Sequence, residues 1–193
     1  GDNISITNNH FEEVEFPVKL SANKNPQISG NTGTNEVIGL WGDVESDNTL
    51  PKYDWDYKLC NNVEIKDDAT LTLTDNTFID LDDERLKIGE SGTSIAKIAA
   101  NNVRFRGDGS SRKQLYFYKN NGSQLTGCHF EKCNIRIYEA SPQITDSRFY
   151  HCNEAIEVEQ ESSPVITNND FYNNETALIH SGSGTLNVSN NYW

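Results

Sequence analysis

A short motif that recurs about every 22 residues is the feature of the sequence that most constrains the fold. In "SPVITNNDF", residues 163–171, an aliphatic residue is followed by asparagine three positions later and by phenylalanine five positions later. The frame fits eight places, with aliphatic anchors at Ile6, Ile28, Leu73, Ile98, Leu125, Ile144, Ile166 and Val188. A period of this length predicts a solenoid, in which each repeat buries its apolar face by stacking on its neighbours.

The side-chain pattern within each repeat predicts strands. Most anchors are preceded, about ten residues earlier, by a second alternating stretch such as Ile156-Glu-Val158. Alternation with period two favours strands, and the frequent Asn, Gly, Ser and Asp residues disfavour helices. We therefore predict an all-β parallel β-helix of about eight to nine coils, roughly 22 residues per coil. Its coils would stack about 4.8 Å apart into a rod about 40 Å long.

Equivalent side chains of successive coils lie above one another in such a fold. We expect the asparagines to form an internal hydrogen-bonded ladder at a turn, since Asn tolerates left-handed backbone geometry. We expect the phenylalanines to stack as a column in the core.

Several stretches, including "PQISGN", "ATLTL", "SPQITDSRF" and "LNVSNNYW", identify a family resemblance that covers nearly the whole chain. They resemble the right-handed parallel β-helix, pectin-lyase-like repeats of large bacterial secreted and cell-surface proteins. The resemblance implies a single domain over residues 1–193, with an irregular crossing at about residues 41–62. This fold hosts lyases, hydrolases, adhesins and passive stalks, so it does not choose among them.

The ends of the sequence resemble an excised piece of a longer solenoid. The chain begins in mid-repeat and stops on Trp193 with no polar capping segment. Exposed end coils would carry unpaired backbone groups, which predicts end-to-end self-association.

The charge narrows the class of partner. With 29 acidic and 16 basic residues, the net charge is −13, and no basic stripe interleaved with aromatic residues is present. Nucleic acid is therefore excluded as a partner, and acidic glycans are disfavoured. A neutral glycan, another cell-surface partner or a divalent cation remains. No run of 18 apolar residues exists, so we expect no membrane insertion. Composition and repeat type favour a secreted or cell-surface protein.

The strongest candidate site is a set of outward side chains on three successive coils: Tyr116, Tyr118, Arg136, Tyr138, Glu157 and Glu159. Three interpretations stay open. Arg136 could pair with a glutamate one coil away on a solvated face, the tyrosines could bind the apolar faces of sugar rings, or Glu157 and Glu159, assisted by Arg136, could be catalytic. The two glutamates are expected about 7 Å apart, which overlaps the carboxylate separation of inverting glycosidases.

Known enzymes on this fold do not match residue by residue. Polygalacturonases carry three aspartates on adjacent coils, and no such triad appears among the outward residues of these strands. We therefore expect a non-catalytic stalk or adhesin-type module that binds carbohydrate. A polysaccharide lyase or glycoside hydrolase domain acting on a plant, algal or host glycan is the alternative.

Metal ligands are weakly indicated. Asp80, Asp82 and Asp83 could supply the oxygen ligands that Ca²⁺ prefers, but they lack a recognised calcium-loop spacing. We expect no other cofactor. Cys133 and Cys152 each follow a motif phenylalanine by three residues and should lie on adjacent coils, either as buried thiols or as a disulfide.

Overall fold

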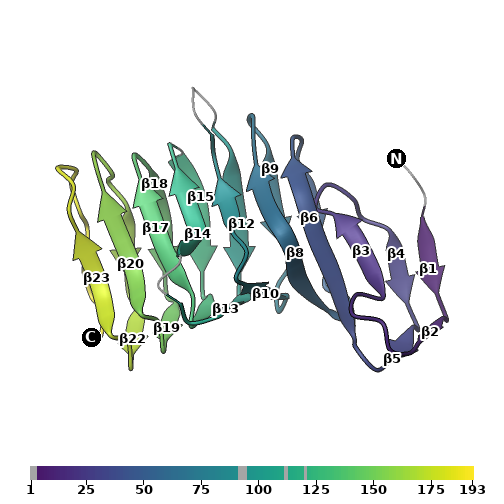
Figure 1. The fold of residues 1–193 in the computed structure, drawn as a ribbon. Coiled ribbons are helices and arrows are strands. Elements are labelled where there is room, and N and C mark those ends of the chain that lie inside the picture. The colour runs from purple at the N-terminus through teal and green to yellow at the C-terminus, as the bar shows by residue number, and fades with distance from the viewer. Residues whose placement is uncertain (1–3, 91–94, 111–112, 120) are drawn as a thin grey trace.

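The chain winds into a stack of parallel strands that forms about eight coils (Figure 1). A computed structural model describes residues 4–90, 95–110, 113–119 and 121–193. Within these residues there are 23 strands and no helix, and every strand pairing is parallel to a strand of the neighbouring coil. The predicted all-β parallel β-helix with about 22 residues per coil is therefore confirmed.

From residue 70 onward each coil contributes one strand to each of three faces. The threonine face contains β9 (Thr70–Leu73), β12 (Lys97–Asn101), β15 (Asn121–Thr126), β18 (Ser141–Thr145) and β21 (Val165–Thr167), and begins at β7 (Asn48–Leu50). The phenylalanine face contains β10 (Phe78–Asp82), β13 (Arg104–Gly107), β16 (His129–Glu131), β19 (Arg148–Tyr150) and β22 (Asp170–Tyr172). The tyrosine face contains β11 (Leu86–Ile88), β14 (Lys113–Tyr118), β17 (Asn134–Tyr138), β20 (Glu154–Glu159) and β23 (Thr176–His180).

The first coils are less regular. They contain the short strands β1 (Ser5–Thr7), β2 (His10–Phe11), β3 (Val18–Ser21), β4 (Gln27–Ser29) and β5 (Thr32–Gly33). Two long strands, β6 (Val37–Val44) and β8 (Asp56–Ile65), follow. Both continue from the phenylalanine face onto the tyrosine face, and so join these two faces into one sheet.

Residues 41–62, expected as an irregular crossing, differ from that expectation. They carry the end of β6, all of β7 and the start of β8. Leu40 pairs with Leu59 and Val44 with Ile65, with only a register shift between them. The alternation of buried side chains persists on both sides of this shift, so the strand bends through a bulge where later coils make a tight turn.

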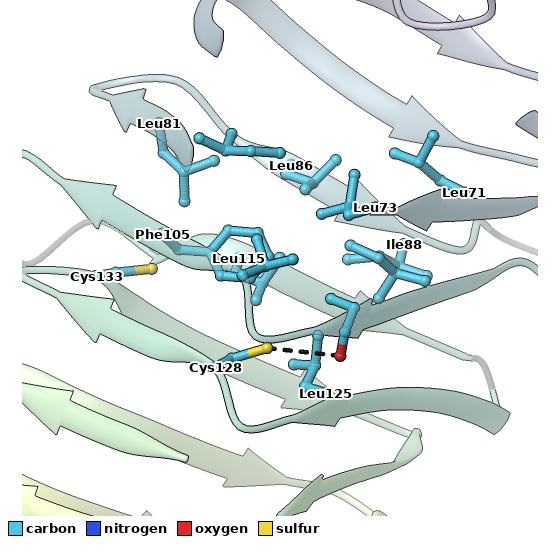
Figure 2. Packing of buried hydrophobic residues seen from close by; sticks show 14 of the residues in the cluster. Leu71, Leu73, Leu81, Leu86, Ile88, Phe105, Leu115, Leu125, Cys128 and Cys133 are labelled. Atoms are coloured by element: carbon cyan, nitrogen blue, oxygen red, sulfur yellow. Dashed lines mark hydrogen bonds between the residues drawn. The ribbon is translucent and has the colours of Figure 1, made fainter. Parts of the chain in front are cut away.

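Aromatic rings stack through the core as the motif predicts. Phe130 lies 4.6 Å from Phe149 and Phe149 lies 4.7 Å from Phe171 between ring centroids, with the rings nearly parallel. Phe105 extends the column in one direction and Trp193 in the other. Aliphatic side chains from all three faces fill the remaining interior (Figure 2).

Two motif copies were aligned incorrectly from the sequence. Leu73 pairs with Ala100, which pairs with Leu125, so Ala100 is the anchor of its coil and Ile98 is not. Phe105 consequently occupies the aromatic column in place of Val103. In the preceding coil, one extra residue puts Ile79 in the column and turns Phe78 outward. The two copies fail for different reasons: the turn after Leu73 holds one additional residue, whereas Ala100 keeps the usual spacing to Phe105 and is preceded, two positions earlier, by the more strongly apolar Ile98.

The internal ladder exists, and its side chains bond the backbone of the coil before. The Asn169 side-chain oxygen accepts a hydrogen bond from the backbone N–H of Ser147 at 2.9 Å, and its Nδ2 donates to the carbonyl of Ile144 at 2.9 Å. Ser147 Oγ accepts in the same way from the N–H of Cys128. The left-handed backbone conformation falls one position earlier than expected, on residues such as Asn168, with φ of 58°.

Replacing the ladder residue Asn169 with alanine should destabilise the fold. Asn169 is 2% exposed, and the substitution N169A leaves the Ser147 N–H and the Ile144 carbonyl without their partner. The loss of two buried hydrogen bonds should lower the free energy of unfolding by about 2–4 kcal/mol, measured by chemical denaturation. The adjacent control N168G should be nearly neutral or stabilising, because Gly accepts the left-handed conformation. Equal effects of the two substitutions would contradict the ladder's role.

Candidate functional site

The predicted site residues lie together on the tyrosine face, on three successive coils. Strand pairing aligns Tyr116 with Arg136, and Arg136 with Glu157. The same register aligns Tyr118, Tyr138 and Glu159 in a second column. The strands are straight and paired on both sides, so the backbone fixes these six side chains as two parallel outward rows.

Aromatic contacts order the tyrosines. The rings of Tyr118 and Tyr138 stack with centroids 5.4 Å apart and an interplanar angle of 21°. Tyr116 meets Tyr118 at 5.6 Å in a tilted arrangement. Partial burial raises the pKa of the Tyr116 phenol, so this ring remains neutral at physiological pH. The three rings form a patch that combines apolar faces with hydroxyl groups.

Arg136 joins the tyrosines to the acidic end of the face. Its guanidinium donates to both carboxylate oxygens of Glu159, through Nε at 3.1 Å and Nη2 at 2.6 Å. Its Cζ also lies 5.2 Å from the ring centroid of Tyr116 and 5.8 Å from that of Tyr138. The hydrogen bond with Glu159 raises the pKa of Arg136. The Glu159 side chain is only 15% exposed, so its carboxylate is held in a two-point ion pair.

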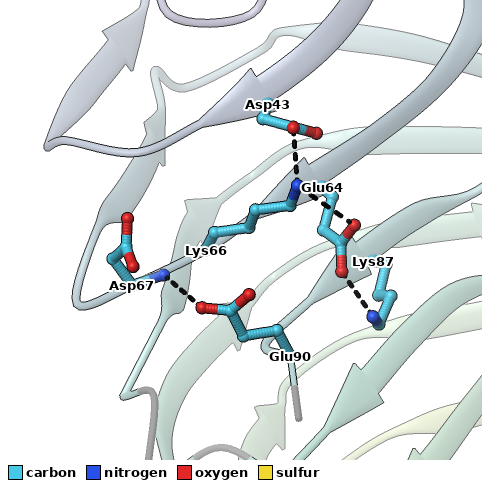
Figure 3. Close-up of polar contacts among 6 residues, drawn as sticks. All are labelled: Asp43, Glu64, Lys66, Asp67, Lys87 and Glu90. Carbon is cyan, nitrogen blue, oxygen red and sulfur yellow. Dashed lines mark hydrogen bonds and ion pairs between the residues drawn. The ribbon is translucent and has the colours of Figure 1, made fainter. Parts of the chain in front are cut away.

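Ion pairs continue along the same face toward the N-terminus (Figure 3). Lys66 Nζ lies 2.6 Å from Asp43 and 3.7 Å from Glu64, and Glu64 also pairs with Lys87. Lys87 Nζ in turn stands 5.2 Å from the ring centroid of Tyr118. Ion pairs thus occupy both ends of this face, and the tyrosines of β14 and β17 lie between them.

The structure also presents a second surface, whose residues were not among those predicted from the sequence. The outer side of the phenylalanine face is hollowed into a shallow groove of about 530 Å³ along β13, β16, β19 and β22. A neighbouring hollow of about 620 Å³ lies over β10 and β13, and both are lined by Arg104 and His129. We call this surface the arginine groove and define it by Phe78, Arg104, Arg106, His129, Glu131, Arg148, Tyr150, Asp170 and Tyr172.

A simple signal could have found the arginine groove. Its residues flank the motif phenylalanines on either side, as in "RFRG" and "SRFY". Since the phenylalanine points inward, its two neighbours must point outward on the same strand. The site residues predicted from the sequence lie on the other strand, about ten residues before each anchor.

Carboxylates expected as calcium ligands are engaged by cations. Asp80 pairs with Arg106, and Asp82 lies 2.8 Å from Lys58 Nζ. Asp83 is exposed on the turn that follows. Within the ranges that the structure describes, no group of three or more His, Cys, Asp or Glu side chains is close enough together to hold a metal ion. The same ranges contain no helix with the length and apolar character needed to cross a membrane.

Comparison with known proteins identifies the repeat but not the activity. A family model described as "Right handed beta helix region" matches residues 56–192. No curated protein and no solved structure matches the chain.

All four cysteines are free thiols, and three of them, Cys128, Cys133 and Cys152, are buried. Cys133 and Cys152 occupy the same corner on adjacent coils, each two residues beyond the paired residues Glu131 and Tyr150. Burial raises the pKa of Cys152 to about 11 and that of Cys133 well above its ordinary value. Cys128 replaces Asn in the ladder, where its Sγ lies 3.6 Å from the Ala100 carbonyl, and its pKa is also about 11 (Figure 2). Such thiols are poor nucleophiles and poor metal ligands.

The thiols should therefore be inert in the folded protein. At pH 8, a thiol reagent such as Ellman's should modify at most Cys60, which is partly exposed, and should modify four cysteines after denaturation. A count of two in the denatured, unreduced protein would reveal a disulfide. Rapid reaction of more than one thiol in the native state would contradict the raised pKa values.

The folded protein should also lose stability at alkaline pH, because burial raises the pKa of two of its thiols. The folded-state pKa of Cys128 and Cys152 exceeds the ordinary value of 9.0, so the unfolded chain loses these protons first. The free energy of unfolding should decrease as pH rises from 9.0 toward about 11, by about 1.4 kcal/mol per pH unit for each thiol. The variant C128A/C152A should show a shallower decrease in pH-dependent denaturation, and an identical slope would refute this assignment.

Proposed function

Since the chain belongs to the right-handed β-helix family, we propose that it is a non-catalytic, extracellular stalk or adhesin-type module that binds a glycan across its tyrosine face. The continuous strand ladder and core support a stiff spacer. The acidic, repeat-rich composition supports placement in a secreted or cell-surface protein. The glycan would be neutral or weakly charged, because acidic side chains contribute to the face.

The observation that carries the non-catalytic assignment is the two-point ion pair between Arg136 and Glu159. An inverting glycosidase needs one carboxyl group that can give up a proton and a second that can activate water. Glu159 is engaged by Arg136 through both of its oxygens, which leaves it poorly placed for either role. Glu157 alone cannot supply the pair.

The tyrosines are the main argument for a glycan as the ligand. Sugar rings present apolar C–H faces together with hydroxyl groups, and tyrosine offers an apolar ring with a polar tip. The stacked pair Tyr118 and Tyr138 lies beside Arg136, which can donate hydrogen bonds from the guanidinium nitrogen that Glu159 does not engage. A ligand lying across the coils would meet both kinds of contact.

A glycan array screened in Ca²⁺ and again in chelator tests the proposal. The strongest neutral hit should bind in calorimetry without release of reducing ends or unsaturated products. The variant Y118A/Y138A should weaken that binding at least about tenfold, because two aromatic platforms are removed. The matched control Y150A/Y172A removes a stacked tyrosine pair from the phenylalanine face and should bind normally.

The outcomes separate the candidate functions. Turnover that E157Q and E159Q abolish would replace the module with a polysaccharide lyase or glycosidase. Binding that Y118A/Y138A leaves intact would remove the tyrosine face from the proposal. Binding lost in chelator and restored by Ca²⁺ would add a cation to the complex.

A further inference from the structure

The arginine groove gathers three guanidinium groups, each beside a carboxylate, in a strongly acidic protein. Arg104, His129 and Arg148 stand at paired positions on three successive coils, so the two arginines are about 10 Å apart along the axis. Arg106 lies beside them on β13. The chain as a whole carries a net charge of −13, yet three of its six arginines line the two adjoining hollows of this groove.

Each of these arginines is fixed by one carboxylate and keeps most of its donors. Among the described residues, Arg104 donates to Glu131 through Nη2, and Arg148 donates to Asp170 through Nε at 3.2 Å. A guanidinium has five N–H groups, so four remain on each arginine. The side chains are 56% and 57% exposed, whereas Arg136 on the tyrosine face is 35% exposed and donates to both oxygens of its partner.

The carboxylate partners hold the arginine side chains in place but leave most of their N–H donors unused. The hydrogen bond from Arg104 lowers the pKa of the Glu131 carboxyl, so Glu131 stays ionised and holds the guanidinium in place. Arg106 is held in the same way by Asp80, whose side chain is only 14% exposed. A donor that is already ordered loses less conformational entropy when a ligand binds.

Aromatic rings lie next to the free donors. The Cζ atoms of Arg104 and Arg106 lie 5.2 Å and 5.1 Å from the ring centroid of Phe78. At the other end, Tyr150 and Tyr172 stack in parallel at 5.6 Å, and the groove beside them is lined by Arg148. Tyr172 is 53% exposed, so part of its ring is available to a ligand.

We propose that the arginine groove is a second binding site, for a linear glycan that carries carboxylate or sulfate groups. The glycan would run along the solenoid axis, with anionic oxygens accepting from Arg104 and Arg148 and a ring packing against Tyr172. The shared chemistry is a planar or tetrahedral anion with two or more acceptor oxygens, which matches the fork of N–H donors on arginine. The site is independent of the glycan proposed for the tyrosine face and would stand if that face bound nothing.

Other extended anions fit the groove less well. A peptide that bound by strand addition would need a free sheet edge, but β13, β16 and β19 are each paired on both sides. Nucleic acid carries a charge at every nucleotide, so the net −13 field would repel it along its whole length. A glycan with separated charges can place them at the arginines alone.

Calorimetry with three defined hexasaccharides tests the site: an alternating oligo-uronate in which every second sugar is neutral, an oligogalactan sulfated on every second sugar, and a neutral cello-oligosaccharide. At least one of the two anionic probes should bind the intact protein, and the variant R104Q/R148Q should weaken that binding at least tenfold. The same substitutions should leave any binding of the neutral probe unchanged. The oligo-uronate and sulfated probes distinguish the two sources of the anion.

Matched controls exclude indirect effects. The variant K24Q/K97Q removes the same charge outside the groove and should retain anionic binding. Circular dichroism and thermal unfolding confirm that R104Q/R148Q is folded, and R148K, which keeps the charge but loses the planar fork, should bind with intermediate affinity. The tyrosine-face variant Y118A/Y138A should bind the anionic probe normally.

Four results would overturn the proposal. Neither anionic probe binds at millimolar concentration, R104Q/R148Q binds as tightly as the intact protein, or Y118A/Y138A alone abolishes anionic binding. Equal binding of a hexaglutamate peptide would show unselective anion attraction and would also overturn a glycan site. None of these results depends on whether the tyrosine face binds a neutral glycan.

Discussion

The structure depends on one interaction, the parallel hydrogen bonding of each strand to the equivalent strand one coil away. A single coil is too thin to enclose a core, so its apolar side chains are buried only when the next coil covers them. This pairing forces equivalent residues into columns, which is why Phe130, Phe149 and Phe171 meet ring to ring. The same constraint extends to the corners, where a buried N–H that no strand can satisfy must find an acceptor in the adjacent coil.

The corners show that the constraint is on the hydrogen bond and not on the residue type. Asn169 and Ser147 accept from the backbone of the preceding coil through different oxygens. Cys128 fills the next position in the same column, with its Sγ near a backbone carbonyl. The residue before each ladder position takes the left-handed conformation, which explains the frequent Asn and Gly at these turns. The asparagine motif is thus a local solution to a repeated backbone problem.

Stacking assigns every inward position, so binding chemistry is confined to the outward side chains of each face. The tyrosine face and the arginine groove use these positions differently. On the tyrosine face Arg136 engages both oxygens of Glu159 and leaves aromatic surface as the main free feature. In the groove, Arg104 and Arg148 are each fixed through one hydrogen bond and leave donors for a ligand. One fold therefore presents two outward surfaces of different chemistry, one mainly aromatic and one with unused guanidinium donors.

The sequence by itself determined the strands, the solenoid and the alignment of the tyrosine-face residues. The alternation of apolar and polar residues specifies each strand locally, and a nearly constant repeat length specifies which residues stack on one another. It did not determine the register at Ala100, because Ile98 lies two positions earlier on the same side of the strand and fits the local pattern equally well. Nor did it determine the continuous course of β8, because a register shift inside a strand leaves the alternation on both sides of it unchanged. Net charge likewise concealed the arginine groove. A charge of −13 is a sum over the chain, whereas the approach of Arg104 and Arg148 depends on which coils pair, and only the tertiary structure decides that.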